Sequence, residues 1–130
     1  MNELAIIQLQ GVGADCTPCG SRVTCDPPPT DTDQDYLVVV PDESGKVGRV
    51  VDILHENGFA WEGSEHYQMA ADTFMSWRKG DVNLIVTRNP EFARRHKLAT
   101  AICKRLNLMR KADRIAVFQG VLYDNFEAAK

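Results

Sequence analysis

The chain has 130 residues and a mass of 14.5 kDa, about the size of one domain with a core of its own. Hydrophobic residues make up 44% and charged residues 25% of the sequence, which is typical of soluble globular proteins and excludes collagen, coiled coils and disordered tails. No apolar run approaches the roughly 18 residues that span a membrane, and the N-terminal segment has neither the basic start nor the apolar stretch of a signal peptide. We therefore expect a cytoplasmic protein with a single domain over residues 1–130 and no membrane contact.

Charge is divided unevenly between the two halves of the chain. Residues 1–72 contain thirteen acidic and three basic residues, whereas residues 73–130 contain five acidic and twelve basic residues. An acidic half can hold divalent cations, and a basic half can hold phosphates. Both halves are equally compatible with ordinary solvated surface, so charge alone does not separate these interpretations.

The first half of the chain predicts a helix, a strand and a second helix. Residues 2–10 are apolar and predict a short helix. Residues 14–32, rich in Cys, Thr, Pro, Gly and Ser, predict an irregular segment with a short strand near Ala14–Pro18. The β-branched run Tyr36–Val40 predicts a buried strand. Apolar residues then recur at helical spacing over Val47–Leu54, which predicts one face of a helix.

The second half predicts a hairpin followed by two helices. Residues 73–79 and 82–87 are strand-like runs, and Gly80-Asp81 between them is typical of a tight turn. Asn89, followed by a proline and an acidic residue, is a helix start, and that helix extends to about Leu106. A last helix covers about Lys111–Tyr123. We therefore expect the α+β class, with a small mixed β-sheet and helices packed against it.

The cysteines raise the question of a metal site. Cys16 and Cys19 have the two-residue spacing of zinc sites and redox dithiols. The sequence has no second close pair, and the prolines at 27–29 follow where a redox motif needs a long helix. We interpret all four cysteines as free thiols, with Cys103 on the buried side of its helix. A structural metal held by Cys16, Cys19 and Cys25 is the alternative.

The histidines and tryptophans show no pattern of their own. His55, His66 and His96 lack the spacing of metal ligands, so we interpret them as surface or partly packed residues. Trp61 and Trp77 are expected in the core rather than as platforms for stacked bases.

The most informative stretch is Gly20-Ser21-Arg22, followed after ten residues by Asp33-Gln34-Asp35 at the entrance of the predicted strand. Alternate residues of a strand point to the same face, so Asp33 and Asp35 should project side by side. Two carboxylates at this spacing repel each other unless a cation lies between them, and Mg²⁺ prefers such oxygen ligands. The small-residue turn can bring backbone N–H groups close to phosphate oxygens, and Arg22 adds a permanently charged donor.

This pattern resembles the nucleotidyltransferase superfamily of the DNA polymerase beta type, whose signature is Gly-Ser, a spacer, and Asp-x-Asp leading into a hydrophobic strand. The resemblance covers roughly residues 14–88, and residues 32–38 match the second half of the signature well. The basic stretch over residues 104–119 is similar to small nucleotidyltransferase-like proteins encoded by bacteriophages. That second resemblance implies a place in the cytoplasm of a bacterial host.

The superfamily resemblance implies a role for each residue of the pattern. Asp33 and Asp35 would bind Mg²⁺ or Mn²⁺ and take part in catalysis. Gly20 and Ser21 would hold the β- and γ-phosphates of a nucleoside triphosphate (NTP), with Arg22 as a further donor. A third acid on a later strand would help to activate the acceptor.

The sequence departs from the superfamily at that third acid. The matching strand has Asn83 in the expected position, and an amide cannot serve as a base near neutral pH. Asp81 precedes it by two residues and would share its face. Asp81 either takes over the catalytic role or simply occupies the hairpin turn.

Three functions follow from these observations. The first is transfer of a nucleoside monophosphate from an NTP to a protein, RNA or small-molecule acceptor. A second subunit or a host partner is an alternative source of the part of the site that binds the acceptor. The second is a catalytically inactive protein of the same fold that binds a nucleotide or a host protein. The third is a nucleic-acid-binding accessory protein. The basic helix face with Arg94, Lys97 and Lys104 is either solvated or faces the triphosphate or a nucleic acid.

Overall fold

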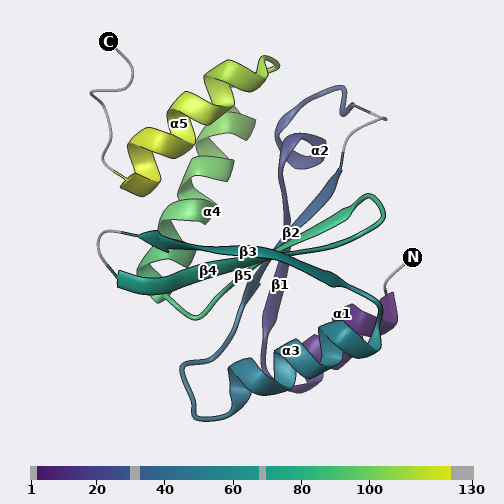
Figure 1. Cartoon of the computed structure of the whole chain (residues 1–130). Coiled ribbons are helices and arrows are strands. Elements are labelled where there is room, and N and C mark those ends of the chain that lie inside the picture. The colour runs from purple at the N-terminus through teal and green to yellow at the C-terminus, as the bar shows by residue number, and fades with distance from the viewer. Residues whose placement is uncertain (1–2, 30–32, 68–69, 124–130) are drawn as a thin grey trace.

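A computed structural model describes residues 3–29, 33–67 and 70–123, which form a five-stranded mixed sheet with helices on both faces (Figure 1). The strands are β1 (Asp15–Cys19), β2 (Gln34–Val39), β3 (Ala60–Tyr67), β4 (Ala70–Lys79) and β5 (Val82–Thr87), in the spatial order β1-β2-β5-β4-β3. The helices are α1 (Glu3–Gly11), α2 (Ser21–Thr24), α3 (Lys46–Glu56), α4 (Pro90–Arg105) and α5 (Lys111–Tyr123). Strands β2 and β5 are parallel and the other neighbours are antiparallel, so the predicted α+β class is confirmed.

The two faces of the sheet are covered by different helices. Alternate residues of β2 enter different hydrophobic clusters: Val38 lies with Leu54 of α3, and Leu37 lies with Phe92 of α4. Helices α1 and α3 therefore cover one face, while α4 and α5 cover the other (Figure 1). Asp35 precedes Leu37 by two residues, so its side chain belongs to the face of α4 and α5.

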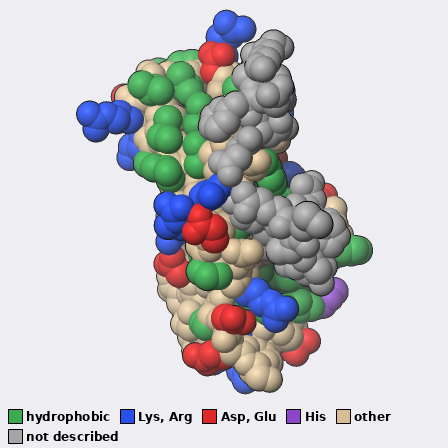
Figure 2. All heavy atoms as spheres, turned by 90° about the vertical axis from the view of Figure 1, so that its left-hand side faces the viewer, with side chains coloured by type: hydrophobic (Ala, Val, Ile, Leu, Met, Phe, Trp, Pro, Cys, Tyr) green, Lys and Arg blue, Asp and Glu red, His purple; other side chains and the backbone are tan. Residues whose placement is uncertain are grey.

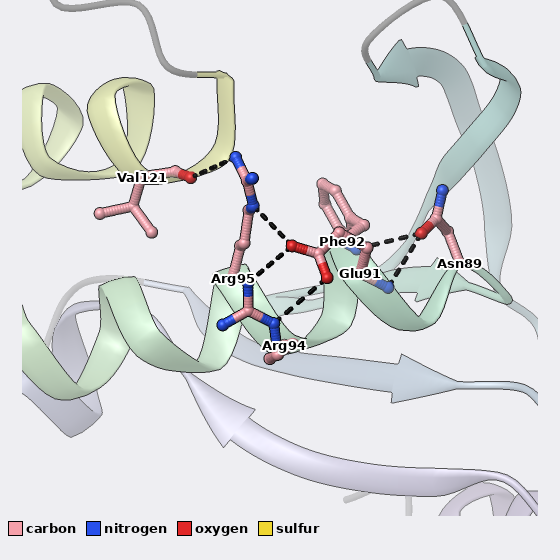
Figure 3. A network of polar contacts seen from close by, with 6 residues as sticks. All are labelled: Asn89, Glu91, Phe92, Arg94, Arg95 and Val121. Atoms are coloured by element: carbon pink, nitrogen blue, oxygen red, sulfur yellow. Dashed lines mark hydrogen bonds and ion pairs between the residues drawn. The ribbon is translucent and has the colours of Figure 1, made fainter.

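The start of α4 follows the predicted capping pattern and also holds α5 in place (Figure 3). Asn89 Oδ1 accepts hydrogen bonds from the backbone N–H of Glu91 and of the next residue, at 3.0 and 3.1 Å. Glu91 accepts hydrogen bonds from Arg94 and Arg95, and Arg95 Nη1 donates to the carbonyl of Val121 in α5 at 3.3 Å. This network fixes α5 across α4, beside the face of the sheet that carries Asp35.

Two elements were not predicted from the sequence. Strand β3 forms although it has no β-branched run, because the neighbouring strand β4 supplies its hydrogen-bonding partner. Helix α2 is a single turn inside the segment expected to be irregular, and it follows Gly20, whose φ is 77°.

Burial corrects two expectations about single residues. Trp77 is 2% exposed, as predicted, but Trp61 is 58% exposed because it lies on β3 at the edge of the sheet. His55 is exposed, as predicted, whereas His96 is buried in α4. The side chain of His66 lies outside those that the structure describes.

The cysteines are free thiols, as predicted, and Cys103 is fully buried. Burial raises the pKa of Cys16 to about 11 and that of Cys19 to about 12. The alternative metal site of Cys16, Cys19 and Cys25 is not found, since no group of three or more His, Cys, Asp or Glu side chains in the described residues could hold a metal ion. Over the same residues, no helix has the length and apolar character needed to cross a membrane.

Candidate functional site

The site is built on a row of residues that crosses neighbouring strands. Asp35 of β2 lies opposite Asn83 of β5, and Asn83 lies opposite Arg78 of β4. Asn83 Nδ2 donates a hydrogen bond to Asp35 Oδ1 at 3.2 Å. On the other side of Asp35 is Cys19, the last residue of β1, so the following Gly20 also lies beside Asp35.

Gly20 allows the turn to approach Asp35 closely. Its φ of 77° is in the left-handed region that disfavours residues with a side chain. A Cβ atom added at this position would overlap the carboxylate of Asp35 and lie 2.8 Å from its Cγ. Both the conformation and the available space therefore require glycine, and the Gly-Ser turn lies beside the acidic pair as the pattern predicted.

Asp33 and Asp35 face a common cavity of about 450 Å³, which we call the acidic cavity. Their predicted side-by-side placement is confirmed by this shared cavity. Helix α5 forms the opposite wall, which the sequence analysis did not anticipate. The lining side chains are Ser21, Asp33 and Asp35, together with Lys111, Arg114, Ile115 and Phe118 of α5.

Asp33 is held by an ion pair with Arg78 of β4, which β5 separates from β2. Arg78 Nη2 donates to Asp33 Oδ2 at 2.9 Å, and Arg78 Nε donates to Glu62 Oε1 at 3.1 Å. The hydrogen bond from Arg78 lowers the pKa of Asp33, with a smaller contribution from the positive charge of Lys111. Asp33 is therefore ionised at neutral pH.

The pKa of Asp35 is shifted in the opposite direction from that of Asp33. Its partial burial raises the pKa of the carboxyl group, and the negative charge of Asp33 adds to this rise. The hydrogen bond from Asn83 lowers the pKa but does not outweigh burial. Asp35 is thus a partly desolvated carboxylate that a nearby cation would stabilise.

Asp81 and Arg22 lie beside the row rather than in it. Asp81 occupies the turn between β4 and β5, the second of the two alternatives, and its side chain is 61% exposed. Its carboxylate is 3.9 Å from Arg22 Nη2, and its backbone carbonyl accepts a hydrogen bond from the N–H of Gln34 at 2.7 Å. The charge of Arg22 nevertheless lowers the pKa of both Asp33 and Asp35.

The basic residues of α4 do not line the acidic cavity. Arg94 pairs with Glu91, and Lys97 Nζ lies 2.9 Å from Asp15 Oδ2. Lys97 and Lys104 line a separate cavity of about 270 Å³ beside β1. The cations that line the acidic cavity come from α5, one helix later than the sequence suggested.

The outer surface of the α4–α5 end has a mixed character. Figure 2 shows hydrophobic side chains gathered over this end of the molecule. Leu98, Leu106, Met109 and Ile115 are between 46% and 61% exposed. Hydrophobic side chains therefore interrupt the basic ones, whereas contact with a nucleic-acid backbone needs mainly Lys and Arg.

His96 is the residue near the site that sequence reasoning missed. It is 5% exposed, and its ring packs against Phe92 and Phe118 at centroid distances of 5.8 and 5.1 Å. Together with Asp35 and Asn83 it lines a small cavity of about 230 Å³. Burial lowers the pKa of His96 to about 4, so the imidazole is neutral at pH 7.

Comparison with solved structures gives two similar chains of terminal uridylyl transferase 4 from Trypanosoma brucei. The chain with bound CTP is 12% identical, with a TM-score of 0.48, over 78% of the present chain and 36% of that chain. The chain with bound UTP and UpU is 16% identical, with a TM-score of 0.46, over 80% and 37%. The present chain thus corresponds to just over a third of the length of each. No protein-family model matches the sequence, and a search of curated proteins found no match.

The donor set of the acidic cavity fits one hard cation. The carboxylates of Asp33 and Asp35 and the hydroxyl of Ser21 face the same space, and oxygen donors of this kind suit Mg²⁺ or Mn²⁺. Gly20 leaves the space beside Asp35 free of a side chain. Burial raises the pKa of Asp35, so a cation bound beside it would stabilise the ionised carboxylate.

Proposed function

We propose that the protein binds an NTP in the acidic cavity and transfers its nucleoside monophosphate to an acceptor, with release of pyrophosphate. The observation that carries this proposal is the meeting of Ser21, Asp33 and Asp35 in one cavity whose opposite wall is basic. Such a cavity offers oxygen ligands to a cation and positive charge to phosphates. Catalysis of this kind depends on positioning and on charge neutralisation.

The acidic wall would hold the divalent cation. Asp33 and Asp35 are its ligands, and the cation, Mg²⁺ or Mn²⁺, supplies neutralisation of phosphate charge when it is bound. Asn83 orients the Asp35 carboxylate through its hydrogen bond. The Gly20-Ser21 turn, which lies against Asp35, offers backbone and hydroxyl donors to the leaving phosphates.

The basic wall would hold the phosphates. Lys111 and Arg114 line the acidic cavity, and neither forms an ion pair with a carboxylate within the part of the chain that the structure describes. Arg114 Nη1 donates to the carbonyls of Leu108 and Met109 at 2.9 and 2.8 Å. These neutral partners fix the guanidinium without cancelling its charge, so it stays available to an anion.

A specific observation favours the catalytically inactive alternative. The position of the third acid holds Asn83, whose amide already donates to Asp35. An amide cannot accept a proton from the acceptor hydroxyl near neutral pH. Asp81 is in the turn and 3.9 Å from Arg22, so it takes the catalytic role only if it moves toward the cavity. The alternative function is therefore binding of a nucleotide, or of a host protein, without turnover.

The experiment that tests the proposal measures nucleotide binding and pyrophosphate release with each of the four NTPs in Mg²⁺. Lys111→Met should weaken binding, whereas Lys97→Met, which removes a lysine paired with Asp15 outside the cavity, should not. Binding with release supports the enzyme, and binding without release supports the inactive alternative. No binding of any NTP contradicts the enzyme and the nucleotide-binding form of the alternative, which leaves binding of a host protein.

The acceptor and the cellular setting stay predictions. Incubation with labelled NTPs in a bacterial lysate, followed by a search for labelled protein, RNA and small molecules, identifies the acceptor. A second subunit or host partner that completes the acceptor half would appear as a lysate component required for labelling. The predicted bacteriophage origin, host cytoplasm and single domain over residues 1–130 belong to the same proposal.

A further inference from the structure

Arg78 of β4 lies between the acidic pair, Asp33 and Asp35, and the edge strand β3. It lies opposite Asn83 in the β4–β5 pair, in the row that contains Asp35. From this position its guanidinium reaches Asp33 Oδ2 at 2.9 Å and Glu62 Oε1 at 3.1 Å. The sequence motif did not include Arg78, because the pairing of β4 with β5 alone brings it to the site.

The ion pair holds a permanent positive charge beside the carboxylate of Asp33. A guanidinium stays protonated at any physiological pH, and its two carboxylate partners raise the pKa of Arg78 further. Arg78 in turn is the largest influence that lowers the pKa of Asp33. One of the two carboxylates assigned to the divalent cation is therefore already paired with a cation of the chain itself, which Glu62 shares.

The charges around the acidic cavity balance without a metal ion. Asp35 is partly buried and is the other carboxylate on the wall. Lys111 and Arg114 stand opposite with no carboxylate partner in the described residues. Because Arg78 is shared between Asp33 and Glu62, these three groups carry one net negative charge, and together with Asp35 they are balanced by Lys111 and Arg114 before any metal ion enters.

We propose that Arg78 acts as the resident counter-ion of the acidic cavity, so that a triphosphate binds there without a divalent cation. A divalent cation that enters has to share the Asp33 carboxylate with Arg78 and is repelled by the guanidinium charge. The proposal rests on the proposed function only for its choice of ligand. Arg78 is a positioning residue here, since it acts on the ligand through Asp33.

Binding of inorganic tripolyphosphate tests the first part, because this probe removes any dependence on the base. Calorimetry in EDTA and in Mg²⁺ compares the wild-type protein with Arg78→Met, Arg78→Lys and Arg94→Met. Arg94 is a matched control, since it also pairs with a carboxylate but lies on the exposed face of α4. We expect wild-type and Arg94→Met proteins to bind in EDTA, Arg78→Met to bind about tenfold more weakly there, and Arg78→Lys to recover most of the loss.

Titration with Mn²⁺ alone tests the second part. Arg78→Met should bind Mn²⁺ about tenfold more tightly than the wild-type protein, since the cation no longer competes with the guanidinium for Asp33. Tripolyphosphate binding that appears only with Mg²⁺ in the wild-type protein overturns the inference but leaves the proposed function standing. Equal Mn²⁺ affinity in Arg78→Met and wild-type proteins also overturns it. Tripolyphosphate binding in EDTA without binding of any NTP supports the inference and contradicts the proposed function.

Discussion

Asn83 Nδ2 and Asp35 Oδ1 are joined by a hydrogen bond of 3.2 Å between the parallel strands β5 and β2, which hold the two residues in register. The amide thus gives a partly buried carboxylate a donor that does not carry a full charge. The sequence pattern led us to expect a third acid at this position, where the chain has Asn83. An amide in place of an acid leaves one negative charge fewer beside Asp35, so charge repulsion at this position is smaller in the folded protein without a metal ion.

Asn83→Asp should reverse this exchange. In EDTA the variant loses the hydrogen-bond donor and places two carboxylates side by side, so its free energy of unfolding should fall by about 1–2 kcal/mol. Mn²⁺ should stabilise it more than it stabilises the wild-type protein, because three carboxylates then face the cation. Chemical denaturation with and without Mn²⁺ measures both effects. Asp81→Asn is the control: its side chain is 61% exposed in the turn, so the free energy should change by less than about 0.5 kcal/mol.

Asp35→Asn should stabilise the protein while it impairs ligand binding. Because burial raises the pKa of Asp35, its ionised form at pH 7 is a cost to the folded state, and an uncharged amide of the same shape removes that cost. Thermal unfolding in EDTA should show a Tm higher by about 2–4 °C. Asp33→Asn should have the opposite sign, since Arg78 lowers the pKa of Asp33 and its ionised form stabilises the fold at pH 7. Equal shifts in the two variants would contradict this assignment.

Much of the fold and the acidic pair could be predicted because their signals are local. The β-branched run of β2 and the Asn89 cap of α4 each act within a few residues, and both elements form where they were expected. The same holds for Asp33 and Asp35, whose spacing fixes their common face. The Gly20 turn lies where it was expected, because the antiparallel pairing of β1 with β2 sets Cys19 opposite Asp35 and so brings the next residue beside it.

The rest of the site depends on pairings that are distant in the chain. Arg78 reaches Asp33 only because β5 lies between β2 and β4 in the sheet, an order that no local pattern specifies. Lys111 lies opposite the acids because α5 packs across α4, where the Arg95–Val121 hydrogen bond is one of the contacts. Its helical spacing with Ile115 and Phe118 was visible in the sequence, but not which surface that face would meet.

Gly20→Ala should be more harmful than an equally strained substitution elsewhere. Gly20 and Gly45 have φ values of 77° and 82°, so alanine at either position costs about 1–2 kcal/mol in backbone strain. A Cβ at position 20 meets Asp35, whereas a Cβ at position 45 meets no atom within 4 Å. Gly20→Ala should therefore lose additional stability and most tripolyphosphate binding, and Gly45→Ala should keep its binding. Denaturation and calorimetry on both variants check this, and equal behaviour would contradict the close approach to Asp35.

The burial of His96 predicts a loss of stability at mildly acidic pH. In the folded state its pKa is lowered to about 4 from an ordinary value of 6.5, so between these values the unfolded chain binds more protons than the folded one. The free energy of unfolding should fall as the pH is lowered from 6.5 to 4, by about 3 kcal/mol from this residue. His96→Leu keeps an apolar side chain against Phe92 and Phe118 and should flatten the dependence by that amount. Denaturation curves at pH 7 and pH 4 for both proteins measure the difference, and parallel pH dependences would show that His96 is not held neutral by the fold.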